Sequence, residues 1–328
     1  MILSNDTITM KPPYKITPYI LARVASISEK LGEIKAACLH RPPTELRKKN
    51  RIRTIHSSLV IEGNTLSFDQ VTSILENKRV IAPLRDITEV KNAIRTYENI
   101  ELFDPFSIES LCEAHRILMD GLVENAGRLR SKSVGIIKGE QLAHVAPSGT
   151  LVKSLLNDLF HYLKNDDEIL LVKSCVFHYE FEFIHPFLDG NGRMGRLWQS
   201  VILIKYNPVF GYLPVESLIK ENQEEYYRTL AIADSKGEST VFIEFMLRIV
   251  EESLEELLQS QNVTLSGRDR IALFREHIKD GTFTRKDYLR YFKELSTATA
   301  SRDLKEAVES NLLRKEGEKS LTRYKYIM

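Results

Sequence analysis

Two apolar segments, separated by a short run of polar and flexible residues, constrain this chain more than any other feature. The first, FHYEFEFI, has apolar or aromatic side chains at positions 177, 179, 181, 183 and 184, which is enough to bury it. The second, RMGRLWQSVILI, covers residues 193–204 and is typical of a strongly apolar helix. Pro186 ends the first segment and starts a loop. Because Gly190 and Gly192 lie where this loop meets the second helix, we expect the backbone there to approach a ligand closely.

The residues between the two segments combine groups that suit a polyphosphate. They read HPFLDGNGRMGR from His185 to Arg196. A helix N-terminus offers unpaired N–H groups and the positive end of a dipole, which bind anions. Arg193 and Arg196 are three residues apart and project from the same side of the helix, toward the same anion. Asp189 supplies a hard oxygen ligand suited to Mg²⁺, and His185 can accept a proton near neutral pH.

Each of these residues also has a purely structural explanation. Asp189 and Asn191 precede glycines in common turn dipeptides and could cap the helix. His185 alone would be typical of a structural histidine, and Arg193 with Arg196 would be typical of a solvated helix face. A turn or a cap, however, needs neither a base nor a pair of arginines. The combination therefore favours a phosphate-binding active site.

Most of the chain has the pattern of helices. The expected helices cover residues 18–39, 47–63, 67–78, 86–102, 107–123, 148–165 and 168–184. Ser67 stands in the N-cap position of the third of them. The exception is RSKSVGIIKGEQLAHVAPSG, residues 130–149, in which short β-branched runs flank Lys138-Gly139-Glu140. This stretch predicts a β-hairpin that projects from a helical domain.

The last sixty residues form a different pattern. Residues 268–280, 285–293 and 297–313 indicate three helices, and LLRKEG and TRYKYI indicate two strands around Gly317. Three helices followed by a hairpin are typical of a winged helix-turn-helix. From Ser266 onward the chain carries 15 Lys and Arg against 10 Asp and Glu, a net charge of +5 against +1 for the whole chain. This tail either binds nucleic acid, with Arg302 and Lys305 exposed on its third helix, or is a solvated domain that makes protein contacts.

The rest of the composition excludes several classes of protein. A net charge of +1 over 328 residues argues against a protein that coats nucleic acid with its whole surface. Cys38, Cys112 and Cys175 are odd in number and widely spaced, which favours free thiols over a disulfide framework or a zinc site. The N-terminus lacks the apolar core of a signal peptide, and no apolar run is long enough to cross a bilayer. We therefore expect a cytoplasmic protein without membrane contact.

HPFLDGNGRMGR resembles the signature of the Fic family, HxFx(D/E)GNGRxxR, at every specified position. From about residue 15 to its end, the chain is similar to a Fic protein with an N-terminal helical region and a C-terminal winged helix. The resemblance implies a mainly α fold with a small β-hairpin flap. It also implies three domains: an N-terminal helical region (1–90), a Fic catalytic core (91–260) and a winged helix-turn-helix (265–328).

The resemblance also implies an activity and the residues that would carry it out. Most Fic proteins are adenylyltransferases, which move AMP from ATP to a hydroxyl side chain (Ser, Thr or Tyr) of a target protein or of themselves. His185 would then be the catalytic base and Asp189 the Mg²⁺ ligand, and the 130–147 flap would bind the target by strand addition. The implied ATP-binding residues are Gly190, Asn191, Gly192, Arg193, Met194, Gly195, Arg196, Tyr226 and Tyr227. For the two tyrosines, which would line the adenine pocket, ordinary helix packing is the alternative.

A second motif resembles the inhibitory helix of the same family, (S/T)xxxE(G/N). Here it reads Ser58-Leu-Val-Ile-Glu62-Gly63, within TIHSSLVIEGNTLS. The resemblance implies that Glu62 pairs with Arg196 and takes from ATP the arginine that its γ-phosphate needs. The structural alternative is a polar i,i+4 pair on a helix surface, with Gly63 as a C-cap.

Three functional hypotheses follow from these motifs. The first is a protein adenylyltransferase that Glu62 inhibits. The second is a hydrolase that removes AMP at the same site, with Glu62 positioning a water molecule. The third is a DNA-binding regulator whose Fic domain senses nucleotide without turnover, although an intact His185 argues against it. DNA, through the winged helix, and a second copy of the chain are the further candidate partners.

Overall fold

The computed structural model describes residues 11–36, 42, 44–138, 141–259, 265–278, 281–292, 295–317 and 322–327. The chain forms two compact units. The first comprises Met1–His40 with Lys48–Gln259, and the second comprises Arg41–Arg47 with Ser260–Met328. No helix among the described residues combines the length and the apolar character needed to cross a bilayer.

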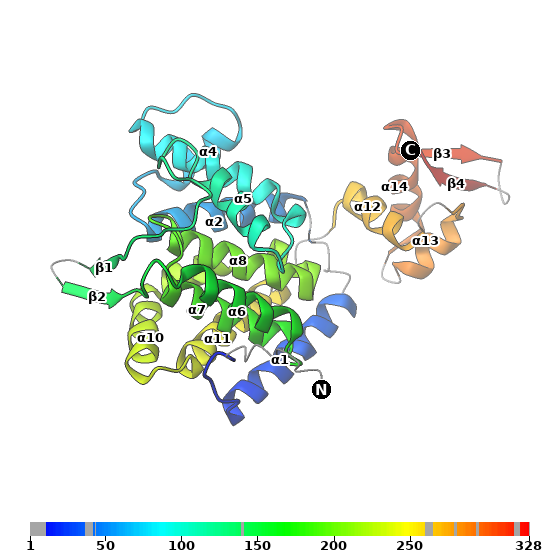
Figure 1. The fold of residues 1–328 in the computed structure, drawn as a ribbon. Helices are drawn as coiled ribbons and strands as arrows, with labels where there is room; N and C mark the ends of the chain where they lie inside the picture. The colour runs from blue at the N-terminus through cyan, green and yellow to red at the C-terminus, as the bar shows by residue number, and fades with distance from the viewer. Residues whose placement is uncertain are drawn as a thin grey trace, which may run out of the picture. The chain divides into compact units, whose positions relative to one another are not determined.

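The first unit is a bundle of helices with one small hairpin (Figure 1). Its elements are α1 (Pro18–Ala36), α2 (Thr44–Ile61), α3 (Phe68–Leu75), α4 (Leu84–Glu98), α5 (Ile108–Leu118), β1 (Gly135–Lys138), β2 (Gln141–Val145), α6 (Val152–Asn165), α7 (Leu170–Ile184), α8 (Asn191–Tyr206), α9 (Val215–Glu221), α10 (Gln223–Lys236) and α11 (Thr240–Gln259). Short 3₁₀ turns cover Ile100–Leu102 and Pro208–Tyr212. The expectation of a mainly α fold is confirmed.

Helix α7 is the centre of this unit. Every residue from Leu171 to Tyr179 is buried, as are Phe181 and Ile184. A helix that is buried on all sides belongs to the core, because no face of it is left for water. Helix α8 packs along it, and α6 and α11 lie against it as well. The buried run predicted before His185 is therefore confirmed, and it holds the end of α7 in a fixed place.

Several helix ends differ from the sequence prediction. Helix α3 has the expected N-cap, since Ser67 and Gln70 form a reciprocal capping box. Helix α5 ends at Leu118 rather than at residue 123, because Gly121 has a positive φ of +69° that breaks the helix. Helix α6 begins at Val152 rather than at residue 148. Here Gly149 packs against the backbone of Ser131, where a Cβ atom would come within 2.2 Å.

The predicted hairpin is present. Strands β1 and β2 pair antiparallel, from Gly135 opposite Val145 to Lys138 opposite Gln141, with a bulge between Ile136 and Ile137. Figure 1 shows the hairpin projecting from the helical body. Its two central turn residues, 139 and 140, lie outside the described residues. We call the hairpin with its flanking residues 130–147 the flap.

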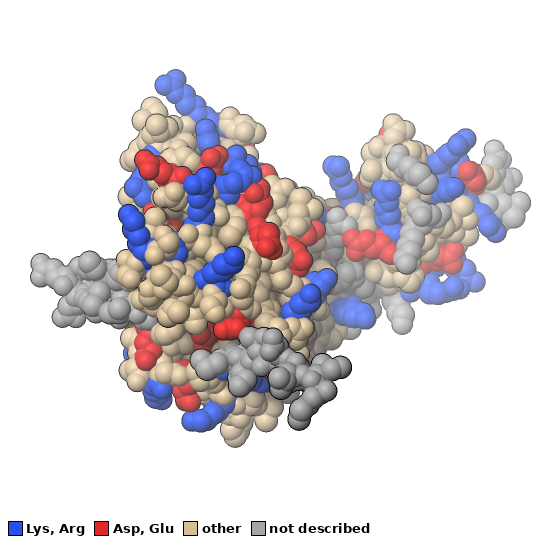
Figure 2. Space-filling view, viewed as in Figure 1, with Lys and Arg blue, Asp and Glu red and all other residues tan. Residues whose placement is uncertain are grey.

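The second unit has the order of elements that the sequence predicts. It contains α12 (Gly267–Ile278), α13 (Arg285–Tyr291), α14 (Thr297–Glu309), β3 (Leu313–Glu316) and β4 (Arg323–Tyr326), with β3 and β4 antiparallel. The predicted ends at 279–280 and 293 lie outside the described residues. Figure 2 shows basic side chains at several places on the surface of this unit, together with acidic ones.

A buried ion pair ties the helices of the second unit together. The Nε and Nη2 atoms of Arg270 donate to the two carboxylate oxygens of Asp303 over 2.7 and 2.8 Å. The hydroxyl of Tyr288 donates to the same carboxylate over 3.1 Å. These contacts connect α12, α13 and α14.

Replacing Asp303 by alanine should destabilise the second unit strongly. The change leaves the Arg270 guanidinium buried without its counter-ion, which costs about 3–5 kcal/mol. Chemical denaturation of the whole chain, followed by hydrogen exchange in α12 and α14, measures the loss. Glu309→Ala is the control, because Glu309 is exposed and approaches Lys305 only to 3.7 Å. Equal stability of the two variants would contradict this role of the ion pair.

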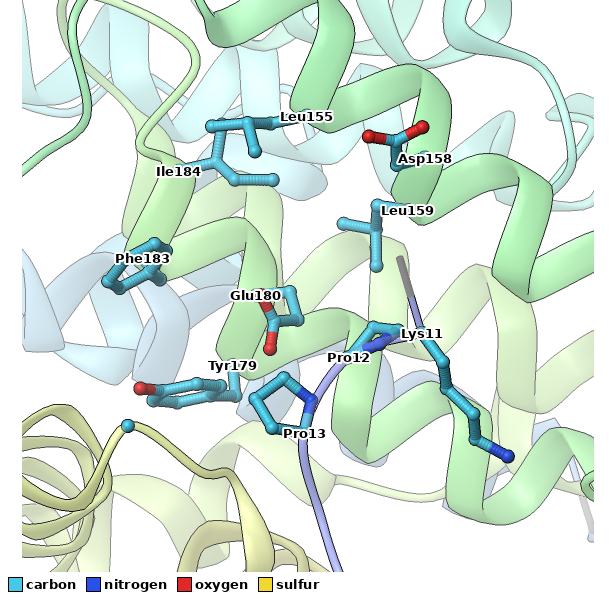
Figure 3. A pocket seen from close by; sticks show the side chains of 11 residues that line it. Lys11, Pro12, Pro13, Leu155, Asp158, Leu159, Tyr179, Glu180, Phe183 and Ile184 are labelled. Carbon is cyan, nitrogen blue, oxygen red and sulfur yellow. The ribbon is translucent and has the colours of Figure 1, made fainter. Parts of the chain in front are cut away.

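A cavity of about 200 Å³ in the first unit encloses a carboxyl group. Its lining comes from the N-terminal segment, α6 and α7, and includes Pro13, Leu159 and Phe183 around Glu180 (Figure 3). Burial, together with the negative charge of Asp234, raises the pKa of Glu180 from 4.5 to about 7. The folded chain therefore holds the proton of Glu180 more tightly than the unfolded chain does.

This shift predicts a pH dependence of stability. The contribution of Glu180 is complete below about pH 4.5, the ordinary pKa, and is lost as the pH rises through about 7. Glu180→Gln keeps the neutral form, so the variant should gain stability relative to the parent between pH 5 and pH 8. Urea unfolding across this range checks the gain. Glu98→Gln, at the exposed end of α4, is the control, and its free energy of unfolding should depend on pH as that of the parent does. The same pH dependence in Glu180→Gln and in the parent would contradict the expectation.

Candidate functional site

The loop between α7 and α8 makes two left-handed turns. His185, the C-cap of α7, has a φ of +50°, a conformation that is uncommon for residues other than glycine. Gly190, the N-cap of α8, has a φ of +82°, and a Cβ atom there would come within 2.7 Å of the Met119 sulfur. The loop therefore places His185 and the N-terminus of α8 at its two ends, only six residues apart.

The side chain of Asn191 closes this loop. Its Oδ1 atom accepts from the backbone N–H of Phe187, and its Nδ2 atom donates to the carbonyl of the same residue, both over 2.9 Å. The structure thus places this predicted ATP-binding residue inside the loop, where its amide group fixes the shape of the backbone.

His115, which the sequence analysis did not identify, supports the loop from α5. Its Nδ1 atom accepts the N–H of Gly127 over 2.8 Å, so Nε2 carries the proton and donates to the carbonyl of Asp189 over 3.0 Å. The ring stacks on Phe187 with 3.7 Å between ring centroids. Burial lowers the pKa of His115 to about 4, so the ring is neutral at neutral pH. A single histidine in an amphipathic helix carries no sequence signal for this role.

Arg193 is buried, and two of its nitrogen atoms make no hydrogen bond to the described residues. The residue is 5% exposed, and its Nε and Nη1 atoms have no hydrogen-bond partner among the described residues. Nη1 lies 3.4 Å from a carboxylate oxygen of Glu89, and Nη2 lies 3.8 Å from one of Asp189. A buried donor without a partner is costly, and a phosphate would satisfy it with charge-assisted hydrogen bonds. The sequence analysis missed Glu89, which lies on α4 more than 100 residues earlier.

The side chain of Asp189 is half-exposed. Its Oδ1 atom accepts the N–H of Gly190 over 2.6 Å, and its Oδ2 atom lies 3.8 Å from Nη2 of Arg85. Within the part of the chain that the structure describes, no group of three or more potential metal ligands is present. One accessible carboxylate fits Mg²⁺ that takes most of its other ligands from water and nucleotide phosphates.

Arg196 is paired with Glu62, as the second motif implied. The Nη2 atom of Arg196 donates to Oε1 of Glu62 over 2.9 Å and to the carbonyl of Ser58 over 3.0 Å. Burial lowers the pKa of the Arg196 guanidinium, but the charge and hydrogen bond of Glu62, together with Tyr226 and Glu182, raise the pKa by more. A Cβ atom at Gly192 would come within 2.5 Å of the same Glu62 oxygen. The Glu62 carboxylate therefore lies directly against the first turn of α8, where an anion would bind.

Met194 and Gly195, the two residues between Arg193 and Arg196, face the protein interior. Met194 is fully buried, and its N–H donates to the carbonyl of Gly190 within the helix. Gly195 faces α7, where a Cβ atom would come within 2.7 Å of a Glu182 oxygen. The structure places both residues at the contact between α7 and α8.

Tyr226 and Tyr227 lie on α10 near this contact. Tyr226 is buried, and its hydroxyl is 3.0 Å from Nε2 of His178, whose Nδ1 atom is 2.6 Å from Oε1 of Gln199. This placement favours the packing alternative for Tyr226. Tyr227 is half-buried, and its ring centroid lies 5.2 Å from that of Tyr226.

The comparisons with known proteins agree with this geometry. Residues 105–203 match the Fic/DOC family. The chain is 30% identical over 237 residues to a protein adenylyltransferase of Caenorhabditis elegans, a match that covers 66% of this chain and 44% of the relative. It is 29% identical over 281 residues to a protein adenylyltransferase of Nematostella vectensis, covering 82% of this chain and 62% of the relative. The chain thus spans about half the length of the curated relatives it matches.

A solved structure covers almost the whole chain. The crystal structure of a Fic family protein from Desulfovibrio desulfuricans G20 is 42% identical, superposes with a TM-score of 0.75, and covers 97% of this chain and 98% of that one. A match of this extent includes both units as well as the loop from His185 to Arg196. The chain therefore belongs to the Fic family.

Proposed function

We propose that this protein transfers AMP from ATP to a hydroxyl side chain of a target protein and releases pyrophosphate. The observation that carries the proposal is the surplus of buried cationic donors at the N-terminus of α8, next to His185. Nε and Nη1 of Arg193 have no hydrogen-bond partner among the described residues, and the charge of Arg196 is paired with the carboxylate of Glu62, which directly follows α2. The names of the curated relatives, which are protein adenylyltransferases, support the same activity.

The phosphates of ATP would bind across the first turn of α8. The backbone N–H groups of Asn191 and Gly192 would face an anion there together with the helix dipole, while that of Gly190 donates to Asp189. Arg193 supplies Nε and Nη1, and Arg196 supplies its guanidinium once Glu62 has moved. Two arginines on the β- and γ-phosphates stabilise the negative charge that collects on the leaving pyrophosphate.

His185 would start the reaction by taking the proton of the target hydroxyl. The hydroxyl oxygen forms a bond to the α-phosphorus, and the bond from that phosphorus to the bridging oxygen breaks. The electron pair of that bond leaves with pyrophosphate, whose charge Arg193 and Arg196 balance. His115 has no part in this proton transfer, because both of its ring nitrogens are engaged by backbone groups.

Asp189 would hold Mg²⁺, and bound Mg²⁺ would supply charge neutralisation on the phosphates. The carboxylate suits this role because it is accessible and because the N–H of Gly190 already fixes one of its oxygens. The neighbouring carbonyl of Asp189 is fixed by His115. The chain's own contribution is thus a carboxylate held in one orientation.

The flap would hold the target. Its sheet has only two strands among the described residues, so an extended target segment can pair with a free strand edge. This pairing uses backbone groups, which lets it accept many sequences. Arg130, at the base of the flap, donates to the backbone carbonyls of His185 and Pro186, so a bound segment would pass close to His185.

Glu62 would keep the enzyme inactive. Its carboxylate occupies the space against Gly192 and takes the donor of Arg196 that the γ-phosphate needs. The two anions exclude each other by repulsion as well as by volume. Because Glu62 is 31% exposed while the Arg196 side chain is 1% exposed, the glutamate is the partner that can leave.

Glu62→Gly should raise AMP transfer by an order of magnitude or more. The change frees Arg196 for the γ-phosphate, and one charge-assisted contact of about 1.5–3 kcal/mol is enough for a gain of this size. Transfer from ATP labelled in its α-phosphate, to the protein itself and to lysate proteins, measures the effect. If Glu62 were only a surface residue at a helix end, the change would cost up to about 1 kcal/mol of stability and add no activity.

Two further variants serve as controls in the same assay. His185→Ala in the Glu62→Gly background should abolish transfer and leave ATP binding within about threefold. Arg196→Ala in that background should cancel the gain. Transfer that survives loss of His185 would contradict the proposal. Label that accumulates in Glu62→Gly only because removal has stopped, as a chase with unlabelled ATP would reveal, would support the hydrolase alternative instead.

A second function, binding of double-stranded nucleic acid by the second unit, is favoured by its hairpin. Arg314 and Lys325 lie directly opposite each other on the exposed face of β3 and β4, with Arg323 and Glu316 as the next pair. Like charges directly opposite each other destabilise a hairpin, and a phosphate backbone would offset that repulsion. Helix α14 exposes Arg302 and Lys305, as the sequence predicted.

The double variant Arg314→Gln/Lys325→Gln should weaken binding to a random duplex of about 30 base pairs. Each lost phosphate contact reduces the slope of log K against log salt by about 0.9, so the slope should fall by about 2. Fluorescence anisotropy over a series of salt concentrations measures the slope. Lys91→Gln, an exposed change on α4 in the first unit, is the control. An unchanged slope would contradict a nucleic-acid interface on this hairpin.

A further inference from the structure

One buried arginine outside the Fic motif, Arg130, joins two segments that the reaction would use together. It is 4% exposed. Its guanidinium donates to four backbone carbonyl oxygens: to His185 over 2.6 Å, to Lys132 over 2.6 Å, to Pro147 over 2.8 Å and to Ile184 over 2.9 Å. Two of these carbonyls belong to the end of α7, and the other two belong to the flap.

On the side of the helix, Arg130 binds three carbonyls in a row. Its side chain takes those of Ile184 and His185, and its backbone N–H donates to that of Pro186 over 2.9 Å. The last carbonyls of a helix lack partners within the helix and carry the negative end of its dipole. A cation bonded to them holds the left-handed turn at His185, a conformation that is unfavourable for a residue with a side chain.

On the side of the flap, Arg130 binds the two strands where they leave the body of the protein. Lys132 precedes β1 and Pro147 follows β2, so their carbonyls bracket the hairpin. One planar group therefore closes the base of the flap. Lysine could not replace it, because an ammonium group lacks the rigid fork of donors that reaches both segments at once.

The hydrogen bonds of Arg130 hold the backbone at His185 in a fixed position relative to the flap. Burial lowers the pKa of Arg130, and among the described residues its side chain is held by neutral carbonyls, with no carboxylate to compensate the cost. The resulting bonds fix the backbone of His185 relative to both ends of the flap. A hydroxyl presented by a segment bound to the flap must meet the imidazole to within a fraction of an ångström, since a misplacement of 1 Å can cost about a hundredfold in rate.

We propose that Arg130 is a positioning residue that sets the distance between the flap-bound target and His185. The proposal rests on the proposed AMP transfer, in which the flap holds the target and His185 is the base. Arg130 itself touches neither reactant. Its role predicts that loss of the fork separates the two segments while the nucleotide site stays intact.

The test compares Arg130→Lys and Arg130→Gln in the Glu62→Gly background. We expect self-transfer of AMP to fall at least tenfold while the Kd for ATP stays within threefold. We expect hydrogen exchange to rise at least tenfold in peptides covering residues 131–134, 146–149 and 184–187, and to stay unchanged in α11. Arg130→Lys keeps a cation in the site, so it gives a result even where Arg130→Gln fails to fold.

Lys173→Gln is the matched control. Lys173 is also buried and donates from Nζ to one backbone carbonyl, that of Asp166, over 2.7 Å, but it touches neither the flap nor the loop. We expect its transfer activity to stay within twofold of the parent. An equal loss in this variant would mean that any buried cation matters and would overturn the proposal.

Further results with the Arg130 variants also test the positioning role. Transfer by Arg130→Lys within twofold of the parent, or a fall in transfer without faster exchange in both segments, would overturn the positioning role. A tenfold loss of ATP affinity would assign Arg130 to the nucleotide site and would overturn it too. If Glu62→Gly itself transfers no AMP, the proposed function fails, and the exchange measurement alone still shows whether Arg130 joins the flap to the loop.

Discussion

The C-terminal end of α7 lies inside the protein, and the rest of the site depends on how its last carbonyl groups are satisfied there. A buried helix cannot leave these groups to water. The chain meets the requirement with Arg130, which collects the carbonyls of Ile184 and His185, and with a left-handed turn that starts the loop. Helix α8 then begins six residues later, so the proposed base and the proposed anion-binding helix end come from one short loop.

Three buried arginines surround this loop, and they differ in the hydrogen-bond acceptors that satisfy their guanidinium groups. Arg130 is satisfied by neutral carbonyls alone. Arg196 is satisfied by the carbonyl and the hydroxyl of Ser58 and by the carboxylate of Glu62. Arg193 keeps two donors without a partner among the described residues. The unmet demand for hydrogen-bond acceptors therefore lies at Arg193, whose neighbouring carboxylates of Glu89 and Asp189 approach only to 3.4 and 3.8 Å, and, behind the Glu62 contact, at Arg196. A triphosphate that spans the first turn of α8 would meet both demands.

The contact between Glu62 and Arg196 has a strength that suits the proposed reversible inhibition of the enzyme. A single charge-assisted hydrogen bond is worth about 1.5–3 kcal/mol, which is comparable to the free energy of about 1–3 kcal/mol that typically couples two binding sites of a protein. The glutamate stands partly in solvent, and its arginine does not. Under the proposed inhibition, opening the site would require movement of the exposed partner only, and the buried cation would stay in place, held by the carbonyl of Ser58.

The sequence by itself determined the features that rest on neighbours in the chain. The apolar run of α7, the capping box at Ser67, the glycines at the start of α8 and the order of elements in the C-terminal unit all leave local patterns. The pairing of Glu62 with Arg196 was implied only through a family motif, because the two residues are 134 positions apart. Only the tertiary structure decided the roles of Arg130, His115 and Glu89 and the buried position of Tyr226. Each of these residues acts through contacts across the fold, and a hydrogen bond between distant residues leaves no periodic or spaced trace in the chain.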